Sequence, residues 1–223
     1  MAPLVALSNF RTALAGVNST LKGYFGGGDT GSNSSEIDGL QFSDETAINP
    51  AATLNVARSD LAGVNSPLKG YFGGGFTGSS SSEIDGLQFS DETAINPAAT
   101  LSLARYYIAA ADSPLKGCFG GGFTGSNSSE IDGLQFSDDT ATNPAATLSI
   151  ARYNAAGVNS TLKGYFGGGY AGSNLSEIDG LQFSDESAIN PSATLSVARR
   201  GLAGVQALPA GNVATLSMVG ATA

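Results

Sequence analysis

The apolar residues of this chain fall into short runs that glycine, proline, serine and asparagine interrupt every few positions. In the first unit of the pattern, such runs cover residues 14–17, 23–26, 36–42 and 52–57. None has the length and 3.6-residue apolar spacing of an amphipathic helix, whereas short runs between turn residues are typical of β-strands. The run at 52–57 contains alanine and leucine, which favour helix, but the preceding proline and the β-branched residues favour an extended strand. The pattern therefore predicts an all-β protein with four strands in each unit.

The same pattern returns every 47 residues. A Tyr-Phe-Gly-Gly-Gly sequence at 24–28 recurs at 71–75, at 118–122 with cysteine in place of tyrosine, and at 165–169. Residues 11–57 and 58–104 are identical at 40 of 47 positions, which indicates recent amplification, or deliberate construction, from one unit. A period of about 40–50 residues that holds four strands is the signature of a β-propeller.

Both ends of the chain carry fragments of a fifth unit. A proline followed eight positions later by an arginine occurs five times, first at Pro3 and Arg11. We therefore divide a single domain, 1–223, into a closing strand (1–10), four full repeats (11–57, 58–104, 105–151 and 152–198) and a partial fifth repeat (199–223). A four-bladed ring would leave the end fragments as open strand edges, which invite aggregation. The sequence therefore predicts a five-bladed propeller whose incomplete last blade is closed by the N-terminal strand, with four blades as the alternative.

The unit resembles the kelch repeat. Apolar residues lead into a glycine doublet at 24–27, a Ser-Glu-Ile-Asp strand follows at 35–38 in the place of the third kelch strand, and a small residue precedes the arginine at 58 that opens the next unit. The unit lacks the tryptophan of that family, and it carries Leu40 and Phe42 where larger aromatics are expected. The resemblance implies kelch-like propeller blades. The amino-acid sequence of the repeat is also similar to repeats in marine phage and cyanobacterial proteins of unknown role.

Composition narrows the range of partners. The chain has a formal net charge of −9, 13% charged residues, no histidine and one cysteine. Nucleic acid and anionic membrane surfaces are bound by clusters of lysine and arginine, which this sequence lacks, so we expect neither as a partner. We expect a monomer without a cofactor. The N-terminus has no basic and apolar signal segment, so we expect a cytoplasmic or virion-associated protein, and its location stays open.

Several repeated motifs suggest chemistry. The G-x-G-x-x-G loops, such as 26–31, match a dinucleotide fingerprint, but a strand and not a helix follows each one, so we interpret them as turns. Glu36 and Asp38, two apart on a strand, form a candidate metal or acid–base pair. Because the pair recurs in every repeat, we favour pairing of one carboxylate with the recurrent arginine and expect no metal site. We interpret the recurrent Lys22 as a solvated charge at the start of a strand, and Cys118 as a buried small side chain.

The most informative positions are those at which near-identical repeats differ. The residue after each glycine triplet varies, and so does the segment that links one unit to the next, at 12–14, 59–61, 106–108 and 153–155. Loops on a rigid scaffold commonly carry binding, although neutral drift explains the same variation. The candidate ligand-binding residues are therefore the four that follow the glycine triplets: Asp29, Phe76, Phe123 and Tyr170.

Three functional classes remain open. The first is a non-enzymatic structural or interaction propeller that binds protein. The second is a glycan-binding, lectin-like propeller with one shallow site per blade, for which the aromatic loop residues are suited to stack on sugars. The third is an engineered or recently amplified propeller without a selected function. An enzyme needs a unique cluster of reactive side chains, and we find no such catalytic set in the sequence.

Overall fold

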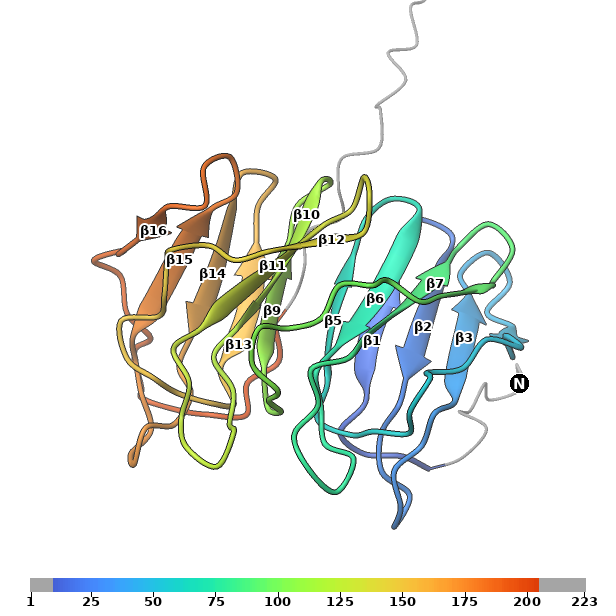
Figure 1. The fold of residues 1–223 in the computed structure, drawn as a ribbon, viewed down its shortest axis with the longest axis horizontal. Coiled ribbons are helices and arrows are strands. Elements are labelled where there is room, and N and C mark those ends of the chain that lie inside the picture. Colours follow the sequence, from blue (N-terminus) through green and yellow to red (C-terminus); the bar gives the residue numbers. More distant parts are fainter. Residues whose placement is uncertain (1–9, 205–223) are drawn as a thin grey trace, which may run out of the picture.

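The computed structural model describes residues 10–204, which form four antiparallel sheets and contain no helix (Figure 1). No membrane-spanning helix therefore occurs in this part of the chain. Each sheet comes from one 47-residue repeat, and its four strands lie in chain order. The all-β prediction is confirmed. The strands are β1 (Ala15–Asn18), β2 (Lys22–Gly26), β3 (Ile37–Gln41), β4 (Ala47–Ile48), β5 (Ala62–Asn65), β6 (Lys69–Gly73), β7 (Ile84–Gln88), β8 (Ala94–Ile95), β9 (Ala109–Asp112), β10 (Lys116–Gly120), β11 (Ile131–Gln135), β12 (Thr140–Thr142), β13 (Ala156–Asn159), β14 (Lys163–Gly167), β15 (Ile178–Gln182) and β16 (Ala188–Ile189).

The fourth strand of each repeat lies elsewhere than the sequence predicts. The runs at 14–17, 23–26 and 36–42 correspond to β1, β2 and β3, but the fourth strand is the short β4 and not 52–57. Residues 52–57 form only an isolated bridge, between Thr53 and Glu36. The amide of Leu54 donates to the carbonyl of Ser35 at 2.9 Å, and the Leu54 side chain is buried. This segment thus packs as an irregular link on its way to the next sheet.

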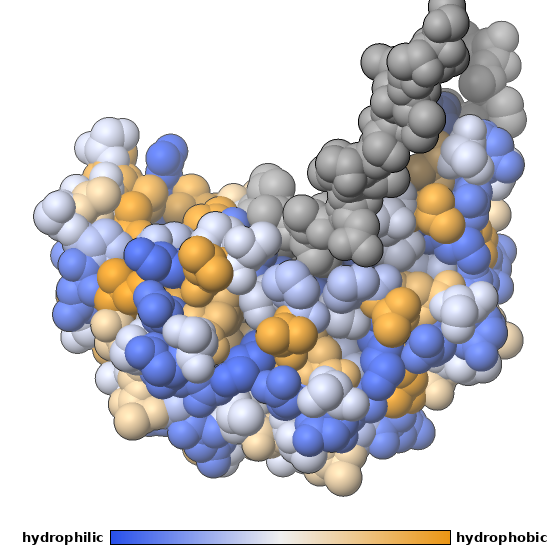
Figure 2. Space-filling view, turned by 90° about the horizontal axis from the view of Figure 1, so that it is seen from above, coloured by the Kyte–Doolittle hydropathy of each residue, from blue (hydrophilic) through white to orange (hydrophobic). Residues whose placement is uncertain are grey.

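The four sheets follow one another around a common axis. The innermost strands lie side by side, β1 next to β5, β5 next to β9, and β9 next to β13. Seen from above, the described residues form a broad arc (Figure 2). Close approach of the inner strands requires very small residues, because a Cβ atom on Gly63 would overlap the carbonyl oxygen of Gly16. The arrangement of the described residues is therefore propeller-like.

Each repeat is held by a buried ion pair between its first arginine and the aspartate of its third strand. The Arg58 side chain is fully buried, its Nη1 lies 2.6 Å from Oδ2 of Asp85, and its Nη2 donates to the carbonyl of Phe72 at 2.9 Å. The preference for arginine pairing is confirmed, because Asp38 and its equivalents all bind the recurrent arginine. The other pairs are Arg11–Asp38, Arg105–Asp132 and Arg152–Asp179.

Adjacent sheets meet through an aromatic stack. The ring of Tyr24 stacks on Phe89 of the next sheet at 5.5 Å, and Tyr71 stacks on Phe136 at 5.3 Å. At the third junction Cys118 replaces the tyrosine, and it is buried, as the sequence predicts.

Three of the four recurrent lysines belong to these junctions and are not free strand-entry charges, so that interpretation is wrong for them. Lys22, Lys69 and Lys116 each form an ion pair with a carboxylate of the next sheet, at 2.6, 2.9 and 2.7 Å. Their carboxylate partners lie in the turns between the third and fourth strands of those sheets: Glu92, Asp139 and Glu186.

The inner links of the repeats are joined by a series of backbone hydrogen bonds around the axis. In each step, the amide of one link residue donates to the carbonyl of its equivalent 47 positions earlier, at 2.9–3.0 Å. Five link residues take part in this series, and all of them have a positive φ: Ala13, Asp60, Tyr107, Asn154 and Gly201. A fifth link therefore occupies the place that the repeat predicts, beside the fourth sheet. Residues 1–9 of the predicted closing strand (1–10) and residues 205–223 of the partial fifth repeat lie outside the described residues.

Candidate functional site

The variable positions of the repeats gather at one end of the propeller-like array. This end carries the links between sheets and the loops that follow β2, β6, β10 and β14, at the bottom of Figure 1. In each repeat, the link residue pairs with the residue after the glycine triplet in an isolated antiparallel bridge. The structure therefore brings each predicted loop residue beside a predicted link residue. The four bridges are Thr12–Asp29, Ser59–Phe76, Tyr106–Phe123 and Tyr153–Tyr170.

Five of these residues form a continuous aromatic ladder, which comprises Phe76, Tyr106, Phe123, Tyr153 and Tyr170. Successive ring centroids are 5.1, 5.7, 5.4 and 5.5 Å apart, and all four pairs are tilted or edge-on. Such geometry is favourable for aromatic pairs. All five rings are half-buried, so one side of the ladder faces solvent.

The ladder ends differently on its two sides. Beyond Tyr170, the guanidinium of Arg200 stands 4.3 Å from the ring centroid in a cation–π contact. At the other end, next to Phe76, the ladder stops because Asp29 and Ser59 occupy the two positions that hold rings in the next repeats. The first junction therefore has small polar side chains where the next two junctions have Phe76–Tyr106 and Phe123–Tyr153.

A cavity of about 520 Å³ opens at this polar end of the ladder. Its size lies within the range of small-ligand sites. It has an aromatic wall, two carboxylates and the polar loop after the first glycine triplet. The lining residues that bear on its chemistry are Asp29, Asn33, Asp60, Phe76, Tyr106 and Tyr107.

Local hydrogen bonds fix the two carboxylates. Oδ1 of Asp29 accepts the amide of Gly31 at 2.6 Å, in the turn where Gly31 adopts a φ of 102°. Oδ2 of Asp60 accepts the hydroxyl of Ser59 at 3.3 Å. Burial raises the pKa of Asp60 above its ordinary range, and the negative charge of Asp29 raises it further. Burial and the nearby Asp60 also raise the pKa of the Tyr107 phenol.

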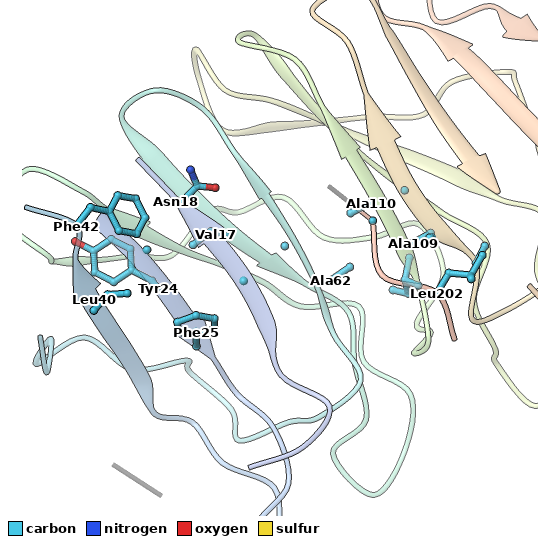
Figure 3. A pocket seen from close by; sticks show the side chains of 18 residues that line it. Val17, Asn18, Tyr24, Phe25, Leu40, Phe42, Ala62, Ala109, Ala110 and Leu202 are labelled. Carbon is cyan, nitrogen blue, oxygen red and sulfur yellow. The ribbon is translucent and has the colours of Figure 1, made fainter. Parts of the chain in front are cut away.

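A second cavity, of about 500 Å³, follows the axis between the inner strands (Figure 3). Ala62, Ala109 and Leu202 line one part of it, and Tyr24 and Phe25 of the first sheet line another. Phe25 is 38% exposed, whereas its equivalents Phe72, Phe119 and Phe166 are fully buried against the preceding sheet. The lining is largely alanine, glycine and other apolar side chains, so this cavity offers few groups that could orient a ligand.

One unique carboxylate lies beside the axis, near the end of the inner strands. Asp112 replaces the asparagine of the other repeats and is 1% exposed. It accepts the amide of Asn65 at 2.7 Å and the side-chain amide of Asn159 at 3.1 Å. Burial raises the pKa of Asp112 to about 7, although these hydrogen bonds act against the shift. The sequence analysis did not single out this residue; its departure from the repeat was the available signal.

The candidate binding residues thus divide into two groups. Phe76, Phe123 and Tyr170 belong to one ladder, while Asp29 lies at its end and borders the cavity. The sequence analysis did not foresee the contact of Arg200 with the ladder, or that Asp29 and Asp60 line the same cavity. Within residues 10–204, no group of three or more histidine, cysteine, aspartate or glutamate side chains is placed to hold a metal ion.

Comparison with known proteins adds no relative. No protein-family model matches the chain, and the search of curated proteins finds no similar sequence.

Proposed function

We propose that this protein is a non-enzymatic propeller of kelch-like blades that binds its partner at the cavity beside Asp29. The supporting observation is that the repeats differ most where the structure gathers side chains around one opening. Neutral drift alone has no reason to concentrate aromatic residues in a continuous ladder with an unfilled polar end. Two sets of recurrent carboxylates form structural ion pairs with arginine or lysine, which favours a structural role for them over acid–base chemistry: Asp38, Asp85, Asp132 and Asp179, and Glu92, Asp139 and Glu186.

The other repeats suggest a double substitution that should fill the cavity. Asp29→Phe with Ser59→Tyr copies the pair that Phe76 and Tyr106 form at the next junction, so the change extends the ladder with side chains that the repeats already contain. We expect this variant to keep the far-ultraviolet circular dichroism and melting temperature of the parent. Binding of the parent to its partner, measured by surface plasmon resonance, should be lost in the variant. Equal binding by both proteins would place the site elsewhere.

A glycan is the second candidate ligand. An aromatic wall beside aspartate, asparagine and serine suits a sugar ring, which stacks through its C–H face and donates its hydroxyls. In place of one shallow site per blade, we propose one site, because ring–ring contacts occupy the equivalent positions at the next two junctions. A glycan array probed with the parent and with the filled variant tests this candidate. A sugar bound by the parent alone supports it, and a parent that binds no glycan excludes it.

We also propose that the propeller closes with five blades. A third cavity, separate from the two described above, is lined by residues of all five links, which lie 47 positions apart. These residues are Ala13–Leu14, Asp60–Leu61, Tyr107–Ile108, Asn154–Ala155 and Gly201–Leu202. The exposed Phe25 leaves room for a further blade against the first sheet. We expect deletion of residues 1–10 to destabilise the protein sharply or to drive it to oligomers. A truncated protein that stays monomeric, by light scattering, with an unchanged melting temperature would exclude this closure.

A further inference from the structure

The cavity beside Asp29 has the electrostatic character of a cation site. Its lining contains two carboxylates, Asp29 and Asp60. Burial raises the pKa of Asp60, and the negative charge of Asp29 adds to this shift. The cavity lining contains no lysine or arginine. A cation placed between the two carboxylates relieves their mutual repulsion and gains two charge-assisted hydrogen bonds.

The aromatic wall of the same cavity favours a flat cation. Phe76, Tyr106 and Tyr107 form this wall, and the ring centroids of Tyr106 and Tyr107 are 4.8 Å apart. Aromatic faces attract cations, and guanidinium groups stack on them with their planes in contact. An ammonium group gains the charge attraction but lacks the flat surface and the fork of donors.

The molecule contains an internal precedent at the other end of the ladder. Arg200 places its guanidinium carbon 4.3 Å from the ring centroid of Tyr170. By the 47-residue register, the position of Arg200 is equivalent to that of Ser59, which borders the cavity. A guanidinium that entered from solvent would cap the open end of the ladder in the way that Arg200 caps the closed one.

We infer that the cavity binds the guanidinium group of an arginine side chain presented by a partner polypeptide. This inference rests on the proposed function and names the chemistry of its ligand. The two carboxylates accept the N–H donors of the guanidinium, and the rings of Phe76 and Tyr106 pack beside its plane. The protein's formal charge of −9 attracts a basic partner at long range.

The first test uses a charged probe and its neutral isostere. Nα-acetyl-arginine amide and Nα-acetyl-citrulline amide have nearly the same shape, but only the first carries a charge. Titrations followed by two-dimensional NMR should show arginine binding at least about tenfold more tightly than citrulline, with weakening as salt increases. Equal affinity for both probes, or no binding of either, would overturn the inference.

Variants identify the side chains responsible. Asp29→Asn and Asp60→Asn should each weaken arginine binding about tenfold, and asparagine tolerates the left-handed backbone at Asp60 (φ 54°). Asp44→Asn is the matched control, because it removes one carboxylate from an exposed turn at the opposite end of the molecule. If all three variants lose affinity equally, the effect is one of net charge and the proposed site is wrong.

A third comparison separates this inference from the glycan candidate. Glucosamine carries an ammonium group, whereas N-acetylglucosamine is neutral. Binding of either sugar without binding of the arginine probe overturns the guanidinium inference and leaves the proposed binding cavity in place. Arginine binding that persists in the Asp29→Phe, Ser59→Tyr variant shows that the probe binds outside the cavity and overturns both.

Discussion

The phenolic oxygen of Tyr71 lies 2.5 Å from Oδ1 of Asp139, which belongs to the next sheet. The same carboxylate accepts Nζ of Lys69, with both of its oxygens 2.9 Å away. Asp139 holds a left-handed backbone with a φ of 58°, as do its equivalents in the other turns. A lysine and a tyrosine of one sheet thus fix a strained turn of its neighbour, and this contact gives the first prediction.

Loss of the lysine should loosen one junction. We expect Lys69→Met to lower the free energy of unfolding by about 1 kcal/mol, because the pair with Asp139 is only partly exposed. Lys163→Met is the matched control, since Lys163 forms no ion pair within residues 10–204. Urea denaturation measures both variants. Equal losses would mean that the lysine stem, and not its charge, supports the junction.

Removal of a buried arginine should cost much more. Arg105→Met leaves the carboxylate of Asp132 buried without its partner, which is typically destabilising by about 3–5 kcal/mol. Arg199→Met changes the equivalent residue of the fifth link, which is exposed, and we expect a change below about 1 kcal/mol. Thermal and urea unfolding measure the loss of stability of each variant relative to the parent protein. A loss at Arg105 no larger than that at Arg199 contradicts the structural role of the buried pair.

Asp112 should make stability depend on pH in an unusual direction. Its folded-state pKa of about 7 lies above the ordinary value of 3.8, so between these values the folded protein holds a proton that the unfolded chain releases. The contribution of this group therefore falls as pH rises from about 4 to 7 and stays low above that. Asp112→Asn removes the effect. We expect its advantage over the parent to grow from near zero at pH 4 to roughly 2–4 kcal/mol at pH 8.

The control for Asp112 is the reverse change at an equivalent position. Asn65 is also buried, so Asn65→Asp should destabilise the protein at pH 8 and much less at pH 4. Unfolding free energies of the three proteins across this range test the argument. An advantage of Asp112→Asn that does not vary with pH would show that the carboxyl group does not titrate in the folded protein.

The third junction should respond to paired changes. Cys118 and Thr142 stand where the other three full repeats have a tyrosine and an isoleucine, and Oγ1 of Thr142 donates to Glu186 at 3.0 Å. This hydroxyl takes over the role that the tyrosine hydroxyl has at the other junctions. Cys118→Tyr with Thr142→Ile should restore a ring stacked on Phe183. We expect a favourable coupling of about 1 kcal/mol between the two changes in a double-mutant cycle, and additivity would exclude compensation.

The sequence predicted the first three strands of each repeat well, because they follow glycine and apolar patterns that are local. It placed the fourth strand wrongly, since Ala52 and Leu54 are buried by packing of the link and not by strand pairing. The exposed appearance of Lys22 was misleading for a related reason, because its partner Glu92 belongs to the next sheet. Contacts between repeats depend on how sheets are placed around the axis, and no local pattern encodes that placement.

The candidate site was predicted in part. Asp29, Phe76, Phe123 and Tyr170 were identified by their departure from the repeat, and the structure places them at one end of the molecule. The ladder could not be foreseen, because it needs the link residues of the following sheet to lie between the loop residues. The same register argument identifies Arg200 once the ladder is known.

The junction formed by lysine, tyrosine and carboxylate is nearly the same between the first and second sheets and between the second and third. A sheet that meets the wrong neighbour during folding finds the same contacts, so local energies distinguish poorly between correct and shifted orders. Within one chain the short links hold the order of the sheets, but they do not restrain the pairing of sheets from two chains, so we expect exchange of whole sheets at high concentration. Cys118 and Thr142 break this equivalence at the third junction, and Asp112 breaks it along the inner strands of the second, third and fourth sheets. They act as a mark of register in a protein whose parts are otherwise almost interchangeable.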